Sequence, residues 1–377
     1  MSVLIRFFVW FIICASFSIL SACNSFETDG YTLAPMKEYT FDYKVQPSGQ
    51  FFGEKTIIPL QVKGDYFNSV ADWYDNQTIL YITNGTQGSK IYRYNIFNGE
   101  SELFYETKDQ IITLQANPSR RYFVVHTAVT SYEANLVLLD HKGKEALKWG
   151  VGSIELQFVW NPFNEHELFV TSFLDDWSFE TYVLSVQTKT VTNPEVNQPF
   201  IQWVDTTKVA YLKWDEENTS FNAPLYVYDL ESGKEEKMID QILAFQSFKD
   251  ILLTVTSAQM KSIYQLYDQK SLKVIQEFTL PMINTFSDRW WVPNFDYHSG
   301  SKQLYLFKPT AIGSEPESLS FIQFSTETGE GTQLLKNTEN RPISISPDGE
   351  LCLIGFQFEE ILDIKNRTVH FFVKQSF

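Results

Sequence analysis

Two short segments of this chain combine an aromatic ring with a cluster of carboxylates. Aromatic faces stack on sugar rings or anchor peptides, and carboxylates accept hydrogen bonds from hydroxyls or hold cations such as Ca²⁺. We therefore take these residues as candidates for ligand binding. The alternative is that the rings cover strand edges and that the acidic runs are solvated loops. The candidates are Asp175, Asp176, Trp177, Trp214, Asp215 and Glu217.

The same carboxylates suggest a second class of function, which is acid–base catalysis on a glycan. A glycosidase places two carboxyl groups roughly 5 to 10 Å apart across the bond that breaks. Asp175, Asp176, Asp215 or Glu217 would supply that pair. The chain has no motif of a nucleophile elbow, a zinc protease, a phosphate-binding loop or a dithiol redox centre. We therefore expect a non-catalytic protein and keep catalysis as the alternative.

The histidines give no metal-binding pattern. Zinc needs three or four ligands that converge on one point, whereas the five histidines lie in separate segments of the chain. The sequence therefore predicts no metal site and no cofactor. The histidines are His126, His141, His166, His298 and His370.

The N-terminus has the pattern of a lipoprotein signal peptide. One cation, Arg6, precedes fourteen uncharged residues, Phe7 to Leu20, a length typical of a signal-peptide core and too short to span a bilayer comfortably. The segment ends in Leu20-Ser21-Ala22-Cys23, which resembles a bacterial lipobox. The resemblance implies that residues 1–22 are removed, that Cys23 is lipidated, and that the protein lies on the outer side of the cell membrane. An uncleaved signal anchor is the alternative.

The composition is acidic. The 377 residues carry a formal charge of −16, and the loss of residues 1–22, which contain Arg6, leaves −17. Such a chain is repelled by nucleic acids and anionic membrane surfaces, so we expect no nucleic-acid partner and attachment to the membrane through the lipid. Cys14 leaves with the signal and Cys23 is acylated, so no disulfide can form within one mature chain. Cys352 lies in an apolar strand pattern and is expected to be buried.

One pattern of apolar runs and turns recurs seven times between Val70 and Lys374. A four-stranded propeller blade needs roughly 40 to 50 residues, and equivalent positions in the second run of each unit are 42, 46, 41, 42, 53 and 47 residues apart. The sequence therefore predicts an all-β fold, a seven-bladed β-propeller over residues 69–377. The equivalent positions are Leu80, Tyr122, Leu168, Val209, Ile251, Leu304 and Leu351.

Two further features repeat with this period. The third run of several units ends in a polar hairpin with glycine, because a tight hairpin needs the positive φ that glycine adopts freely. At the end of the first run, Trp73, Trp160 and Trp203 occupy equivalent places. A position repeated in successive blades packs one blade against the next, so we interpret these tryptophans as structural.

The loops divide between two faces of the predicted ring. Tight turns follow the first run, as in Asn117-Pro-Ser-Arg120, Asn161-Pro-Phe-Asn164 and Ser346-Pro-Asp-Gly349, and we interpret them as structural only. Longer loops between the second and third runs share the other face, where function on a rigid scaffold concentrates. The predicted long loops are Asn84–Lys90, Ala128–Ala134, Phe173–Glu180, Trp214–Asn222 and Thr310–Ser318.

The residues before the ring divide into two parts. Residues 23–38 mix Gly, Pro and acidic residues without a period, which is typical of a tether. Residues 39–68 contain two strand-like runs that either lie outside the ring or close it. The last unit has a fourth run of its own, Thr368–Val373, which argues weakly against closure by these residues.

A lipobox, a short acidic tether and a propeller over the rest of the chain resemble the YqgU-like β-propeller lipoproteins of Gram-positive bacteria, a family without an assigned activity. That family is described as six-bladed, so the resemblance implies six blades where the spacing predicts seven. The long unit from Ile283 to Leu335 is where an irregular or merged blade would lie.

These observations favour a membrane-anchored, extracytoplasmic and non-catalytic propeller that acts as a binding or scaffold module. We expect its partner to be a protein, a peptide or a cell-wall glycan on the long-loop face. The alternatives are a carboxylate-dependent glycan lyase or hydrolase, and a sensor or assembly factor of a membrane complex.

Overall fold

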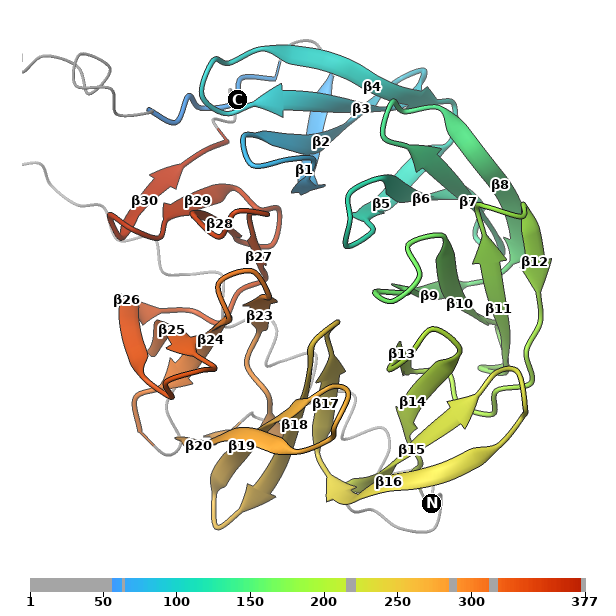
Figure 1. Ribbon diagram of the computed structural model, residues 1–377. Helices are drawn as coiled ribbons and strands as arrows, with labels where there is room; N and C mark the ends of the chain where they lie inside the picture. Colours follow the sequence, from blue (N-terminus) through green and yellow to red (C-terminus); the bar gives the residue numbers. More distant parts are fainter. Residues whose placement is uncertain (1–55, 63–64, 215–221, 285–289, 312–317, 374–377) are drawn as a thin grey trace, which may run out of the picture. The chain divides into compact units, whose positions relative to one another are not determined.

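The computed structural model describes residues 56–62, 65–214, 222–284, 290–311 and 318–373. Within these residues the chain forms seven four-stranded antiparallel sheets arranged around a central opening (Figure 1). The prediction of an all-β, seven-bladed propeller is confirmed, and the six-blade alternative does not match the number of sheets. No helix in these ranges is long and apolar enough to cross a membrane.

The first strand of each blade lines the central opening, and the second strand lies behind it (Figure 1). The first strands are β1 (Tyr66–Trp73), β5 (Gln110–Ala116), β9 (Glu155–Trp160), β13 (Ile201–Trp203), β17 (Ala244–Ser247), β23 (Phe295–His298) and β27 (Ile343–Ile345). The second strands are β2 (Thr78–Gly85), β6 (Tyr122–Thr130), β10 (Glu167–Phe173), β14 (Lys208–Leu212), β18 (Ile251–Ala258), β24 (Gln303–Pro309) and β28 (Leu351–Ile354).

The third and fourth strands complete each blade toward the outer rim (Figure 1). The third strands are β3 (Gly88–Asn95), β7 (Glu133–Asp140), β11 (Phe179–Ser185), β15 (Ala223–Asp229), β19 (Lys261–Asp268), β25 (Leu319–Ser325) and β29 (Glu360–Asp363). The fourth strands are β4 (Ser101–Thr107), β8 (Glu145–Gly152), β12 (Thr190–Thr192), β16 (Glu235–Ile242), β20 (Val274–Pro281), β26 (Gly331–Thr338) and β30 (Thr368–Phe371).

The long sixth unit has a simple structural cause. A short two-stranded ribbon, β21 (Ile283–Asn284) with β22 (Trp290–Trp291), is inserted between the fifth and sixth blades. This insertion lengthens the step from Ile251 to Leu304 to 53 residues without adding or merging a blade.

The core lies between neighbouring blades. In β6, Phe123 and Val125 pack into a cluster with residues of the first blade, whereas Val124 packs into the next cluster with residues of the third. Because successive side chains of a strand point to opposite faces, each blade contributes to two of these layers. Cys352 belongs to one of them, between the sixth and seventh blades, and is fully buried as predicted.

The glycine hairpins between third and fourth strands are also confirmed. Gly99, Gly143, Gly233 and Gly329 all adopt a positive φ, between 69° and 80°. At Gly143 a side chain is excluded by space as well, because a Cβ would lie 2.1 Å from the carbonyl oxygen of Phe104.

Residues 56–62 contact both the first and the last blade. Ile58 N donates to Ile96 O at 2.7 Å, and Leu60 N donates to Phe372 O at 2.8 Å. Leu60 also forms a parallel bridge with Val373. Because β27 to β30 all come from the C-terminal segment, the seventh blade receives no strand exchange, and residues 56–62 are added beside it.

Candidate functional site: the channel mouth

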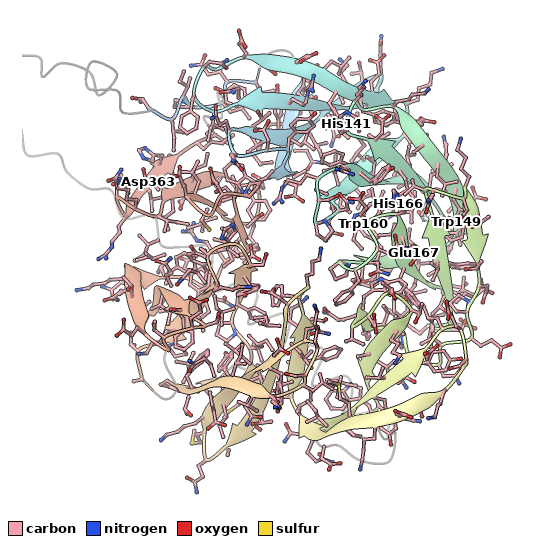
Figure 2. The ribbon with its side chains drawn as sticks, viewed as in Figure 1. His141, Trp149, Trp160, His166, Glu167 and Asp363 are labelled. Carbon is pink, nitrogen blue, oxygen red and sulfur yellow. The ribbon has the colours of Figure 1, made fainter. Side chains whose placement is uncertain are left out.

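A cavity of about 1110 Å³ opens at one end of the central channel. All seven first strands contribute to its lining, and one repeat position, the one before the residue that turns toward the blade interface, lines it in every blade. Side chains reach into this opening in Figure 2, where Trp160 lies near the edge and Trp149 far out in β8. The seven residues at this repeat position are Asp72, Gln115, Val159, Gln202, Gln246, Asp296 and Ser344.

Three of these side chains accept a hydrogen bond from a backbone N–H group of the following blade. Asp72 Oδ2 accepts a hydrogen bond from Ala116 N at 2.9 Å, and Asp296 Oδ2 accepts one from Ile345 N at 2.8 Å. Gln202 Oε1 accepts from Ser247 N at 3.2 Å. The same repeat position therefore both faces the channel and holds the first strand of the following blade.

The tryptophans at the next position make the reverse contact. The Nε1 groups of Trp73, Trp160 and Trp203 donate to the carbonyl oxygens of Ser344, Gln115 and Val159 in the preceding blade, at 3.0, 3.4 and 3.1 Å respectively. All three rings are buried. The prediction that these tryptophans join blade to blade is confirmed.

Two carboxyl groups and one guanidinium interact electrostatically in the cavity. The pKa of Asp296 is raised to about 6. Burial is the largest cause and the charge of Asp72 adds to it, while two backbone N–H groups and the Arg120 guanidinium oppose the shift. Burial also raises the pKa of Asp72, and Arg120 again opposes this. The three side chains are thus near enough to share one electrostatic environment.

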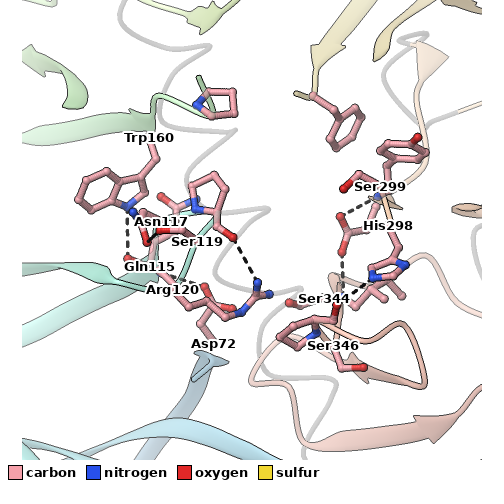
Figure 3. Close-up of a pocket in the computed structure, with 18 of the residues that line it drawn as sticks. Asp72, Gln115, Asn117, Ser119, Arg120, Trp160, His298, Ser299, Ser344 and Ser346 are labelled. Carbon is pink, nitrogen blue, oxygen red and sulfur yellow. Dashed lines mark hydrogen bonds between the residues drawn. The ribbon is translucent and has the colours of Figure 1, made fainter. Parts of the chain in front are cut away.

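Arg120 comes from the Asn117-Pro-Ser-Arg120 turn. Its guanidinium extends into the cavity from the side of Asp72 and faces Ser344 and Ser346 (Figure 3). Its Nη1 lies 3.5 Å from the carbonyl oxygen of Pro118, a marginal hydrogen bond. Its Nε is shielded from solvent and has no hydrogen-bond partner among the described residues. Most of the donors of this side chain are therefore available to a ligand.

The turns after the first strands surround this cavity, so they form the rim of the candidate site in addition to the structural role predicted for them. The lining includes Asn117, Pro162 and Ser346 from the three Pro-containing turns, together with His298 and Lys249. These turns are short because they are well hydrogen-bonded, as in Arg120 N to Asn117 O and Gly349 N to Ser346 O, both at 2.9 Å. Such hydrogen bonds hold the turns, and the side chains that they carry, in a fixed position around the mouth of the cavity.

The long-loop face is less open than predicted. Asn84–Lys90 and Ala128–Ala134 are not long loops, because β2 and β3 meet in a tight hairpin between Gly85 and Gly88, and β6 and β7 meet between Thr130 and Glu133. The strands simply extend further than their apolar patterns indicated. Phe173–Glu180 contains a five-residue loop.

Among the described residues, Trp214 and the Asp175–Trp177 segment do not line the same cavity. Trp177 is 69% exposed and Trp214 is 45% exposed. Trp214 lines a second cavity of about 320 Å³ that the residues Asp175–Trp177 do not line. Ser178 donates to Asp176 through both its hydroxyl and its backbone N–H, which lowers the pKa of Asp176 and uses that carboxylate to shape its own loop.

Three of the predicted site residues lie outside the described residues, namely Cys23, Asp215 and Glu217, as do the signal peptide and the tether. Within the described ranges, no group of three or more His, Cys, Asp or Glu side chains is arranged to hold a metal ion. Burial lowers the pKa of His126, and the His298 ring bridges Ser301 and the Pro347 carbonyl between two turns.

Comparisons with known proteins identify relatives and a common fold. The family described as "YqgU-like 6-bladed beta propeller domain" matches residues 95–355, a range with five complete blades and parts of the first and seventh. An uncharacterized lipoprotein YqgU of Bacillus subtilis strain 168 is 28% identical over 314 residues, covering 83% of this chain and 86% of the relative.

Solved structures extend the comparison. The crystal structure of an uncharacterized protein from Listeria monocytogenes EGD-e has a TM-score of 0.79 and 19% identity, covering 86% of this chain and all of that one. An oligogalacturonate lyase from Vibrio parahaemolyticus has a TM-score of 0.51 and 12% identity, covering 80% of this chain and 88% of that one. At these identities the likeness concerns the fold alone.

Proposed function

Because the chain belongs to the YqgU-like propeller family and has a lipoprotein as a relative, we propose that it is a lipid-anchored extracytoplasmic binding module whose ligand occupies the channel mouth. The observation that carries this proposal is the convergence of seven repeat positions on one polar cavity of about 1110 Å³. Wide cavities with a few convergent charged groups are the usual place for a ligand. Anchoring through Cys23 would place this cavity in contact with cell-wall material.

The chemistry of the mouth supports binding more directly than catalysis. Asp72 and Asp296 each accept a backbone N–H on both carboxylate oxygens. A carboxylate held in this way is fixed in orientation and is a good acceptor for a ligand.

One observation favours a second candidate, which is a glycan lyase or hydrolase. Two neighbouring carboxyl groups with raised pKa values are a feature of acid–base sites. In that case Asp72 and Asp296 would be the acid and base, in place of Asp175, Asp176, Asp215 and Glu217. An enzyme would release shortened oligosaccharides from wall glycan in a chromatographic assay, and the Asp296→Asn variant would abolish them.

The binding proposal is tested with soluble peptidoglycan fragments released by a muramidase. Isothermal titration of the mature chain should give a saturable signal. Gln115 is exposed and lines the cavity, so Gln115→Trp should block the mouth and weaken binding at least tenfold. Trp177→Ala on the opposite face is the control and should bind like the wild type.

The opposite pattern would move the site. If Trp177→Ala loses the fragments while Gln115→Trp keeps them, the ligand occupies the long-loop face and the channel proposal is wrong. If neither the wild type nor either variant binds any fragment, the binding function proposed for cell-wall material fails.

Anchoring is tested separately. Replacement of Cys23 by Ala should abolish incorporation of radiolabelled palmitate and transfer the protein from the membrane fraction to the medium, because a protein that keeps no acyl chain has no lipid attachment. Retention of Cys23→Ala in the membrane fraction would instead support the uncleaved signal anchor.

A further inference from the structure

The charged groups of the channel mouth point to a particular ligand chemistry. Among the lining residues, three side chains are acidic and two are basic, and most of the others are amides or hydroxyls. The acidic residues are Asp72, Asp75 and Asp296, and the basic ones are Arg120 and Lys249. Charge at the mouth is therefore nearly balanced, in a chain whose formal charge is −16.

The two deep carboxylates retain acceptor capacity toward the channel. An ionised carboxylate has about four lone-pair sites. Asp72 uses one site on each oxygen for Trp73 N and Ala116 N, and Asp296 does the same with Tyr297 N and Ile345 N. The remaining sites can accept hydrogen bonds from hydroxyl groups without breaking the contacts between blades.

Arg120 supplies hydrogen-bond donors from a turn position whose backbone conformation favours glycine. Its φ is 56°, and the equivalent residue in the last blade is Gly349, with a φ of 76° and the same turn hydrogen bond. A non-glycine residue in the left-handed region is strained by about 1 kcal/mol. Ten other non-glycine residues of the described chain also have a positive φ, so what distinguishes Arg120 is a guanidinium that extends into the cavity and has few partners.

The other half of the mouth is mainly lined by amides and aromatic rings, with Lys249 as its charged group. Gln202 and Gln246 hydrogen-bond each other through their amides at 3.0 and 2.7 Å, and Trp160 and Phe248 lie among the lining residues. Side-chain amides both donate and accept, which matches sugar hydroxyls, while aromatic rings suit the apolar faces of sugars. The lining offers no row of separate apolar pockets for the side chains of a peptide.

We propose that the channel mouth recognises the sugar part of its ligand, an uncharged oligosaccharide whose hydroxyls donate to Asp72 and Asp296 and accept from Arg120. This inference rests on the proposed function and names the ligand class. An anionic glycan can pair with Arg120 and Lys249 but also places its carboxylates near Asp72, Asp75 and Asp296. A neutral glycan uses both the donors and the acceptors and brings no net charge into the channel.

The test compares four probes at 0.15 M salt: the tetramer of N-acetylglucosamine, its de-N-acetylated cationic form, the tetramer of galacturonic acid, and the stem peptide cut from the peptidoglycan fragments. We expect the neutral tetramer to bind, the acidic tetramer to bind at least tenfold more weakly, and the peptide to give no signal. Tighter binding of the cationic or the acidic tetramer than of the neutral one would overturn the proposal.

The intact fragments separate this inference from the proposed function. If the intact fragments and the stem peptide bind but the neutral tetramer does not, the mouth binds the peptide part of the fragments. The sugar inference is then wrong, while the binding function stands. If the intact fragments do not bind either, the proposed function itself fails.

Variants of Arg120 distinguish a ligand contact from a counter-ion. Arg120→Gly should weaken binding of the neutral tetramer at least tenfold while the urea midpoint stays the same or rises, because glycine suits the positive φ. Arg120→Lys keeps the charge but loses the fork of donors, so it should remain at least fivefold weaker than the wild type. If Arg120→Lys binds as well as the wild type, the guanidinium serves only as a counter-ion and its proposed contact with the sugar is wrong.

Discussion

The channel mouth and the long-loop face belong to the same repeats, yet they hold their side chains by different means. At the mouth, Asp72 and Asp296 are fixed by hydrogen bonds that cross from one blade to the next. On the long-loop face, Asp176 and Trp177 lie in one short loop whose hydrogen bonds are local. Groups fixed by several strands keep their geometry when a ligand binds, whereas a single loop can be changed without affecting the ring.

The pKa values of carboxyl groups in the two regions are shifted in opposite directions. Asp296 lies among strands that exclude water, and its pKa rises. Asp176 is exposed and accepts hydrogen bonds from Ser178, and its pKa falls. Opposite shifts in residues of the same type show that position in the ring, and not residue type, decides the protonation behaviour.

The largest expected effect concerns the tryptophans behind the mouth. Trp203→Ala removes a buried ring and the Nε1 bond to Val159 O, and should lower the free energy of unfolding by about 3–5 kcal/mol. Urea denaturation followed by circular dichroism measures this loss. Trp203→Phe, which keeps most of the packing, is the matched control and should lose less. A loss below about 1 kcal/mol for Trp203→Ala would contradict the blade-to-blade role.

Next in size is the contact between the first two blades. Asp72→Ala leaves the Ala116 N–H without its acceptor, which should lower the free energy of unfolding by about 1–3 kcal/mol. Removal of the Asp72 charge should also lower the pKa of Asp296, as measured by carboxyl carbon NMR. The control is Asp75→Asn on the exposed rim. An unchanged titration of Asp296 in Asp72→Ala would show that the two groups do not interact.

The pH dependence of stability should carry the signature of Asp296. Its folded pKa of about 6 lies above the ordinary value of 3.8, so between these values the folded state binds more protons than the unfolded state. Stability from this group is therefore highest at low pH and falls as pH rises from about 4 to about 6, by roughly 1–2 kcal/mol after allowance for its partial exposure. Urea midpoints measured at pH 4, 5, 6 and 7 give this slope.

Two variants check the assignment. Asp296→Asn should remove the falling component of the slope, whatever its effect on absolute stability. The native Asp176 has a lowered pKa, so its contribution to stability is lost as pH falls. Asp176→Asn should remove this contribution, and the change should be small because the group is exposed. A slope that survives Asp296→Asn would assign the titration to another residue.

The smallest effect is expected on the long-loop face. Trp177 is 69% exposed, and Trp177→Ala should change the free energy of unfolding by no more than about 0.5 kcal/mol. The same urea measurement applies, with Trp203→Ala as the contrasting variant. A loss comparable with that of Trp203→Ala would mean that this loop supports the ring as strongly as the buried tryptophans do.

The fold was largely predictable because its signals are local. Alternating apolar residues mark each strand, glycines such as Gly99 and Gly143 mark the hairpins, and the spacing from Leu80 to Leu351 counts the blades. The channel mouth was harder to predict, because Asp72 and Asp296 are separated by more than two hundred residues and look like ordinary strand residues. One signal was present: each mouth residue precedes the first-strand position that Trp73, Trp160 and Trp203 had already marked.

The amino-acid sequence by itself determined the seven-fold repeat, the turns and the layers between blades, since periodicity and turn chemistry act over a few residues. Which face carries the main cavity was decided only by the tertiary structure. Closure of the ring places the ends of seven short strands around one axis. There the charge of Asp72 raises the pKa of Asp296, and the Arg120 guanidinium opposes the rise in the pKa of both carboxyl groups. Electrostatic interactions of this kind depend on distance in space, which spacing along the chain does not reveal.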